Sequence, residues 1–353
     1  MLETVPYYLV LLIAAIPALT DRIKKPSLGW IGFFILLLLF VGLRYEVGGD
    51  WEGYLQISDF LNGRKLVEIF EHEEIGFNFI VWFSVYLGFG IFGANFVTTT
   101  IFLYGLFKYC ERQANPWLAI VSSLPFLVIV IAMSANRQAA AIGVTFLVMA
   151  GWNKSSLNKK LILIFVAAMF HTSAAIFIVF VILDSKLSLL KKSILSIGLF
   201  VVIGKYLTSS DSILRYQVSY IGDAAVNVSY GALQQIMLNA LPAIVFLIIS
   251  MRSRYFRSIT PHWNIILIMS IMSIILIPLS LTYSVAAARI SFYLFPVSIA
   301  FLATLPVIFP ASSKVLVKLC VILYGFMTLW LWLNFANTAY RHIPYNNVFF
   351  QIF

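Results

Sequence analysis

The chain has 353 residues, of which 61% are hydrophobic and only 11% are charged. Soluble domains carry about a quarter charged residues, so this composition excludes a soluble globular protein. The net charge of +10 is better explained by basic cytoplasmic loops than by nucleic-acid binding, because such loops orient membrane proteins. The two cysteines have no Cys or His at metal-ligand spacing, so we expect no metal site, no disulfide and no cofactor.

Apolar runs recur along the whole chain and determine the expected fold. The first, residues 4–20, follows an acidic start instead of the basic start of a signal peptide, so we expect it to stay in the membrane. We predict one all-α polytopic membrane domain over residues 1–353, with about 10–13 transmembrane segments. The other apolar runs cover residues 28–43, 75–107, 117–133, 138–153, 161–183, 193–207, 234–250, 263–283, 290–307 and 315–334.

The distribution of charge predicts which loops face the cytoplasm. If six basic clusters lie inside, 16 of the 24 basic and 3 of the 14 acidic residues are cytoplasmic, giving +13 inside and −3 outside. The positive-inside rule favours this split. It places the polar loops 44–74 and 208–233, and both termini, on the external, periplasmic side. The clusters are Arg22/Lys24/Lys25, Lys108/Arg112, Lys154/Lys159/Lys160, Lys186/Lys191/Lys192, Arg252/Arg254/Arg257 and Lys314/Lys318.

The side assignment has consequences for two apolar runs. Residues 161–183 must begin and end in the cytoplasm, although these 23 residues are too few for two crossings. We therefore predict a re-entrant helix pair with its turn near Phe170-His171-Thr172-Ser173, at membrane depth, where non-helical backbone is tolerated only beside a polar cavity or buried in protein. Residues 75–107 must cross an odd number of times, so Gly88-Phe89-Gly90 is predicted to separate an interfacial helix from one span.

Three arginines at the external ends of spans are candidate ligands for a diphosphate. Arg44 closes the second span, Arg137 lies between two spans with almost no loop, and Arg289 precedes a later span. An arginine within a membrane costs about 2.5–3.5 kcal/mol at a span centre, so such residues are usually functional. Guanidinium groups bind phosphate oxygens in pairs. The alternative for Arg44 is a side chain that snorkels at an ordinary solvated turn.

His171, Asp50 and Glu74 are the candidate catalytic residues. An imidazole with an ordinary pKa near 6.5 is mostly neutral at pH 7, so His171 is the expected proton acceptor, although a lone buried histidine is often only hydrogen-bonded core. Asp50 and Glu74 suit the binding of sugar hydroxyls, or the base role if burial raises their pKa. The helix dipole alone can also explain Glu74. The candidate sugar-binding residues are Tyr54, Gln138, Arg215 and Tyr216.

An ordered set of short motifs resembles the EpsG family of bacterial exopolysaccharide proteins, which is akin to the Wzy polymerases of O-antigen and capsule synthesis. The resemblance spans most of the chain and is strongest over residues 40–180. Each motif alone is unspecific. The motifs are Arg44…Gly49-Asp50…Tyr54, Glu74-x-Gly76-Phe77, Asn136-Arg137-Gln138…Ala141 and Phe170-His171-x-Ser173 with a downstream Arg289.

The resemblance implies an inner-membrane enzyme that polymerises polyprenyl-diphosphate-linked oligosaccharide repeat units on the periplasmic face. It also implies a fold similar to the GT-C class of multi-span glycosyltransferases. The implied partners are an undecaprenyl-diphosphate-linked oligosaccharide, membrane lipid and a regulator of chain length. The sequence has neither a GxGxxG nor a Walker motif, which argues against a nucleotide-sugar donor. Two alternatives stay open: a lipid-linked oligosaccharide flippase, and a polysaccharide O-acyltransferase with a deep histidine as base.

Overall fold

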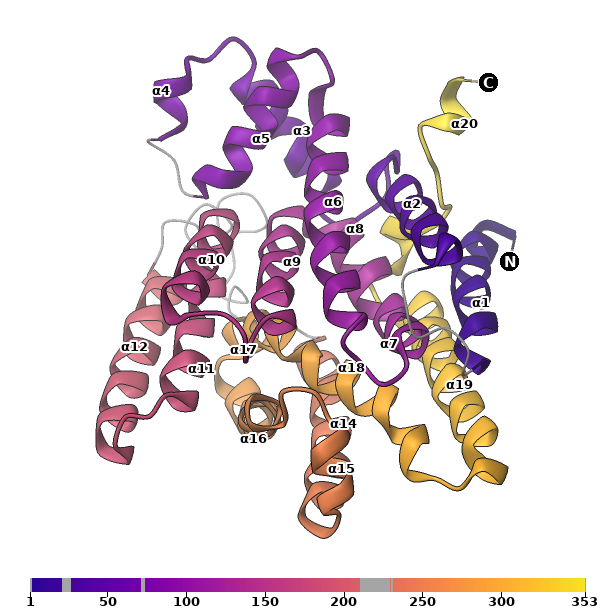
Figure 1. Cartoon of the computed structure of the whole chain (residues 1–353). Coiled ribbons are helices and arrows are strands. Elements are labelled where there is room, and N and C mark those ends of the chain that lie inside the picture. Colours follow the sequence, from indigo (N-terminus) through magenta and orange to yellow (C-terminus); the bar gives the residue numbers. More distant parts are fainter. Residues whose placement is uncertain (1, 21–26, 71–73, 210–228, 230, 353) are drawn as a thin grey trace.

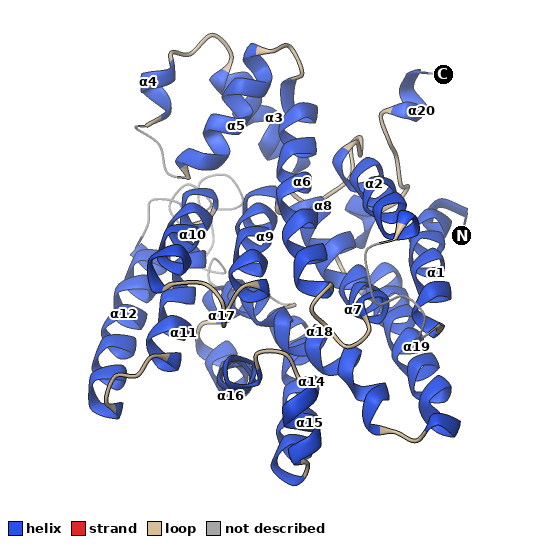
Figure 2. Cartoon of the chain, in the orientation of Figure 1, coloured by secondary structure: helices blue, strands red, loops and turns tan. Residues whose placement is uncertain are grey.

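The computed structural model of the chain describes residues 2–20, 27–70, 74–209, 229 and 231–352. Within these ranges every regular element is a helix (Figure 2). Many of the helices coincide with the apolar runs of the sequence; for example, the run 263–283 forms a helix over Trp263–Thr282. The predicted all-α fold is therefore confirmed.

The elements follow one another along the chain as labelled in Figure 1. Most are α-helices, while η2 is a π-helix and the other η elements are short 3-10 helices. They are η1 (Leu2–Thr4), α1 (Val5–Leu19), α2 (Leu28–Gly42), α3 (Trp51–Leu61), α4 (Leu66–Ile69), α5 (Ile75–Tyr86), α6 (Gly90–Cys110), α7 (Pro116–Ser123), η2 (Leu124–Ile131), α8 (Ala132–Ser134), α9 (Asn136–Ala150), α10 (Leu157–Phe170), η3 (Thr172–Ile176), α11 (Phe177–Asp184), α12 (Leu189–Ser209), α14 (Ala232–Arg252), α15 (Arg254–Ile259), α16 (Trp263–Thr282), α17 (Ser284–Ser291), η4 (Phe292–Leu294), α18 (Phe295–Thr304), η5 (Leu305–Ile308), α19 (Ala311–Phe335), η6 (Ala339–His342) and α20 (Phe349–Ile352).

Helix length and composition identify the segments that can cross a bilayer. Among the described residues, six helical segments are long and apolar enough to span, and further apolar helices are shorter. The chain is therefore a multi-pass membrane protein. The six segments are Gly90–Cys110, Pro116–Ser134, Ala232–Arg252, Trp263–Thr282, Ser284–Ile308 and Ala311–Phe335, and the shorter apolar helices are Val5–Leu19, Leu28–Gly42, Ile75–Tyr86 and Thr172–Asp184.

Two breaks that the sequence predicts are present. The run 75–107 divides into the short helix α5 and the long helix α6, with the break at Leu87–Phe89. The run 161–183 divides at His171, whose backbone is extended (φ −155°, ψ 122°) between α10 and η3.

The second break makes a hairpin, because Trp152 before α10 and Asp184 at the end of α11 are in contact. The Trp152 Nε1–H donates to Asp184 Oδ2 at 2.7 Å. The two ends of the helix pair therefore lie on one side, as a re-entrant pair requires. The position of the pair relative to the cytoplasm stays a prediction.

Contacts between distant segments join helix ends that the charge pattern assigns to one face. On the predicted cytoplasmic side, Lys318 Nζ donates to Leu19 O at 3.0 Å, and Trp30 Nε1 donates to Glu111 Oε1 at 3.1 Å. Figure 1 shows α15, which carries further basic residues, at the opposite end of the molecule from α3, α4 and α5. The helices thus form a bundle with two chemically distinct ends.

The first and last segments of the chain meet on the other side. The Tyr7 hydroxyl donates to His342 O at 2.5 Å, and Tyr345 N donates to Glu3 O at 3.3 Å. Both termini therefore share one face of the bundle, and that this face is external stays a prediction, like the external placement of loops 44–74 and 208–233.

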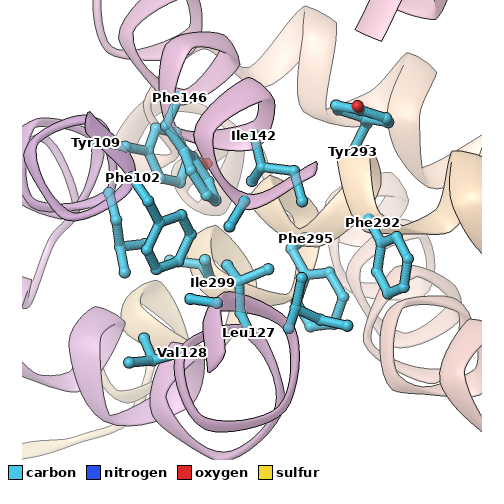
Figure 3. Packing of buried hydrophobic residues seen from close by; sticks show 14 of the residues in the cluster. Phe102, Tyr109, Leu127, Val128, Ile142, Phe146, Phe292, Tyr293, Phe295 and Ile299 are labelled. Atoms are coloured by element: carbon cyan, nitrogen blue, oxygen red, sulfur yellow. The ribbon is translucent and has the colours of Figure 1, made fainter. Parts of the chain in front are cut away.

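Helices α6 and α9 pack closely against each other. A Cβ on Gly105 would lie 1.8 Å from Gly143 O, and a Cβ on Gly143 would lie 2.4 Å from Phe102 Cα. Small residues let membrane helices approach in this way. Around the contact, aromatic and aliphatic side chains fill the interior, with Phe102 and Phe146 on one side and Leu127 and Phe295 on the other (Figure 3).

Candidate functional site

Three of the predicted site residues meet at the end of the bundle that is predicted to be external. Glu74 directly precedes α5, Arg137 lies in the first turn of α9, and His171 stands at the turn of the hairpin. Arg137 Nη1 lies 2.6 Å from Glu74 Oε2, and His171 Nε2 lies 3.8 Å from Glu74 Oε1. The Arg137 side chain is 29% exposed and that of Glu74 is 11% exposed, so the ion pair is largely withdrawn from water.

The hydrogen bonds of His171 define which ring nitrogen carries a proton. The backbone N–H of Ser173 donates to His171 Nδ1 at 3.3 Å, and the Ser173 hydroxyl lies 2.6 Å from the same nitrogen. Because a backbone N–H can only donate, Nδ1 is the acceptor and the neutral ring carries its hydrogen on Nε2, toward Glu74. The Ser173 hydroxyl also lies 3.0 Å from the Tyr293 hydroxyl, which connects the hairpin turn to η4.

Arg289 reaches the same region from α17. The Gln138 side chain on α9 donates through Nε2 to the carbonyl oxygen of Arg289 at 3.2 Å. Within the described residues, the Arg289 guanidinium has no hydrogen-bond acceptor, and its charge acts on Asp50, His171 and Tyr293. Arg289 is therefore a cation that can accept an anionic ligand without breaking an ion pair in the described structure.

Asp50 faces the arginines from the start of α3. It occupies the N-cap position, where an aspartate usually bonds to the helix backbone, but its side chain makes no such bond. Burial raises the pKa of the Asp50 carboxyl, and this effect outweighs the opposite influence of Arg137 and Arg341. The buried ring of Tyr54, one turn further along α3, lies 5.8 Å from Arg137 Cζ.

Arg44 is only 1% exposed, and its charge interacts with Tyr54 and Asp50. Its Nε donates to Val47 O at 3.0 Å, its Nη1 to Val41 O at 2.8 Å and its Nη2 to Asn136 Oδ1 at 2.5 Å. Asn136 in turn donates to Asn95 on α6. The guanidinium of Arg44 thus ties the end of α2 to the start of α9, beside Arg137.

Two of the predicted sugar-binding residues, Arg215 and Tyr216, lie outside the described residues. Most of loop 44–74 is described, and it contains α3 and α4.

The structure adds three side chains that were not among the predicted site residues. Ser173 appears in the sequence motif without an assigned role, and Tyr293 stands four positions after Arg289, where a helix brings two residues to one face. Arg341 acts on Asp50 and contacts Gly49 across 292 positions of the chain. That separation leaves no local signal in the sequence.

With Arg341 included, the cluster combines three arginines, two carboxylates, one imidazole and two phenols from six segments of the chain. The charges of Arg137 and Arg289 act on both Asp50 and His171. Such a set can bind a phosphorylated ligand and accept a proton beside it. Among the described residues, no group of three His, Cys, Asp or Glu side chains gathers as a metal site.

Comparison with known proteins gives one result. Neither curated proteins nor solved structures yield a match, so the expected likeness to the GT-C class of glycosyltransferases stays a prediction. The sequence model described as the EpsG family matches residues 28–347, which include every residue of the cluster. The match covers nearly the whole chain and points to a role as a polysaccharide polymerase of the glycosyltransferase type. The chain belongs to the EpsG family, which is related to the Wzy-like polymerases.

Proposed function

We propose that the protein polymerises polyprenyl-diphosphate-linked oligosaccharide repeat units by glycosyl transfer on the periplasmic face of the bacterial inner membrane. The observation that carries the proposal is the meeting of Arg137, Glu74 and His171, with distances of 2.6 Å from Arg137 to Glu74 and 3.8 Å from His171 to Glu74, in a region where Arg137 and Arg289 also influence Asp50. Two arginines supply paired donors for a diphosphate, while a carboxylate beside them supplies the proton acceptor. The product belongs to the class of O-antigen, capsule or exopolysaccharide chains.

Arg137 and Arg289 are proposed to bind the glycosyl donor, which is the polyprenyl-diphosphate-linked repeat unit. When the lipid carrier binds, its phosphate oxygens compete with Glu74 for Arg137 and engage Arg289 directly. The acceptor hydroxyl oxygen forms a bond to the anomeric carbon, and the bond from that carbon to the diphosphate oxygen breaks. The electron pair of the broken bond stays on the diphosphate, where preorganised guanidinium groups stabilise the developing charge.

Asp50 is our candidate for the group that takes the proton of the acceptor hydroxyl. The lone pair on His171 Nδ1 already accepts from Ser173, so the choice lies between the carboxylates of Asp50 and Glu74. The carboxylate of Asp50 makes no capping bond, and burial raises its pKa, which makes it a stronger base than an ordinary aspartate. This assignment replaces His171, which the sequence favoured, and gives His171 and Glu74 the task of holding Arg137.

The remaining candidates have supporting tasks. Tyr54 and Gln138 line the region around Arg137 and Arg289 and are proposed to contact the sugars. Arg215 and Tyr216 keep the same proposed role from the loop 208–233. Arg44 is proposed to position α9 instead of binding phosphate, because its donors already meet protein acceptors.

A reconstituted reaction separates this function from its alternatives. The purified protein in detergent is incubated with polyprenyl diphosphate repeat units and no other donor, next to an Asp50→Asn variant. A ladder of products from the wild type and none from the variant supports the polymerase. Transport of the lipid-linked unit in liposomes without a ladder supports a flippase. In a parallel incubation to which an acyl donor is added, acyl transfer without a ladder supports an acyltransferase.

A further inference from the structure

The segment after α19 returns to the loop that carries Asp50. We define residues 336–348 as the C-terminal strap. Its backbone pairs with the loop after α2, since Tyr45 N donates to Asn346 O at 3.1 Å and Val348 N donates to Leu43 O at 2.9 Å. An isolated β-bridge between Arg44 and Asn347 lies between these two bonds. The strap and the loop therefore form one joined unit at the external end.

The strap also holds the two glycines before Asp50. Gly48 N donates to Arg341 O at 2.8 Å, and Arg341 Nη1 donates to Gly49 O at 2.7 Å. On the opposite side, Gly49 N donates to the Ser134 hydroxyl at 3.0 Å. The peptide groups on both sides of Gly49 are thus fixed, which fixes the position of the Asp50 backbone.

The loop that carries Asp50 packs closely between the strap and α8 at Gly48. The φ of Gly48 is +116°, and a Cβ at this position would lie 1.9 Å from Met133 O. Only glycine accepts both the conformation and the contact. The position of the loop therefore explains why residue 48 is a glycine.

The strap is anchored in the bundle. The side chain of His342 is 1% exposed, its Nε2 lies 3.3 Å from the Ser134 hydroxyl, and its ring packs edge-on against Trp332 at 4.8 Å between centroids. The Tyr7 hydroxyl donates to the carbonyl oxygen of the same residue at 2.5 Å. These contacts of His342 fix the backbone next to Arg341.

We propose that the C-terminal strap positions the carboxylate of Asp50, with Arg341 as the positioning residue that grips the peptide groups before it. The proposal rests on the function proposed above, in which Asp50 takes the proton. The strap thus influences the reaction through the position of Asp50, and no residue of the strap has to touch the sugars.

The charge of Arg341 gives the proposal a second readout. Asp50 is faced by Arg137 from α9, by Arg289 from α17, by Tyr54 from its own helix α3, by Arg341 from η6 and by Arg44 from the loop after α2. Arg137, Arg341 and Arg289 lower the pKa of the carboxyl, against the raising effect of burial. Loss of Arg341 therefore raises the pKa of Asp50, and the acidic limb of the pH profile of kcat moves to higher pH.

The experiment compares Arg341→Gln, Arg341→Lys and the control Arg64→Gln in the full-length purified protein. Arg64 is an external arginine in an exposed pair with Glu68, so its replacement leaves the strap intact. Two quantities are measured: hydrogen–deuterium exchange of the backbone over residues 44–52, and polymer formation against pH.

For Arg341→Gln we expect faster exchange over residues 44–52, a fall in kcat of about 10²-fold with KM changed much less, and an acidic limb at higher pH. Arg341→Lys keeps the charge and should restore the position of the limb, while Arg64→Gln matches the wild type. The proposal would be overturned if Arg341→Gln changed neither the hydrogen–deuterium exchange over residues 44–52 nor the pH profile. If the wild type makes no polymer at all, the proposed function fails, and the exchange data still decide whether the strap holds the loop.

Discussion

Arg44 and Arg137 both stand at the end of a helix on the predicted external side, but the structure gives them opposite environments. Arg44 is buried and directs its donors to two carbonyl oxygens and an amide. Arg137 is partly exposed and is paired with the carboxylate of Glu74, which a stronger anion can displace. A guanidinium group whose N–H donors already bond to neutral protein acceptors, as in Arg44, stabilises the fold. A guanidinium group paired with a carboxylate, as in Arg137, can exchange that carboxylate for an anionic ligand.

The largest expected effect concerns the proton acceptor beside Arg137. We expect Asp50→Asn to lower turnover by about 10²–10⁴-fold, the range for loss of a general base. His171→Gln should lower it by about tenfold or less, since His171 is proposed only to hold Glu74 and Arg137. Turnover is measured against pH with lipid-linked substrate saturating. A large loss in His171→Gln together with near-normal turnover in Asp50→Asn would return the base role to His171.

The next effect tests the arginines of the site. Arg137→Lys and Arg289→Lys should each lower turnover by about 10²–10³-fold, as for loss of one donor to developing charge, because a point charge does not reproduce the guanidinium fork. The amount of folded protein should stay normal. Product length on gels and detergent-solubilised yield are the measurements. Full-length polymer from both lysine variants would reject the diphosphate assignment.

Arg44 should behave in the opposite way. Arg44→Lys leaves buried acceptors without a donor, at a cost in stability of about 1–3 kcal/mol for each group left unsatisfied. The yield and the thermal midpoint should fall, while turnover per folded molecule stays within about tenfold of the wild type. Normal stability with lost turnover would place Arg44 with Arg137 after all.

The smallest effect on activity is expected for cysteine substitutions at the two ends of the hairpin, which test its side of the membrane by labelling. Ser156→Cys and Ser188→Cys lie before and after the helix pair and should leave turnover unchanged. In intact cells, both cysteines should be inaccessible to a membrane-impermeant thiol reagent. Labelling of either from the periplasm would contradict the re-entrant arrangement that places His171 beside Glu74.

The sequence was sufficient for the apolar helices and for both breaks, but not for α3 and α4, which lie in the predicted polar loop 44–74. Runs of apolar residues end where glycines or a polar turn interrupt them, so the break at Leu87–Phe89 and the turn at His171 could be predicted. Charge distribution assigned Glu74, Arg137 and Arg289 to one face. It could not tell which of them meet, because that depends on how α5, α9, α10 and α17 pack together.

The difference between the arginines could not be predicted either. Whether Arg44 is saturated depends on carbonyl groups near the end of α2 and on Asn136, 92 positions away along the chain. Arg341 is still further from its partner Gly49, and nothing in the intervening sequence marks the strap. Periodicity and charge describe single helices and faces, whereas these contacts arise only when distant segments fold against each other.

The central claim is that Arg137 and Arg289 hold the diphosphate and Arg44 does not. The most direct measurement is the affinity of the purified protein for undecaprenyl diphosphate, with Arg137→Gln, Arg289→Gln and, as a control, Arg64→Gln, which changes an arginine in an exposed pair with Glu68. We predict that each of the first two raises Kd by about tenfold or more, equivalent to about 1.4 kcal/mol, while the control binds like the wild type. Wild-type affinity in both Arg137→Gln and Arg289→Gln would contradict the claim.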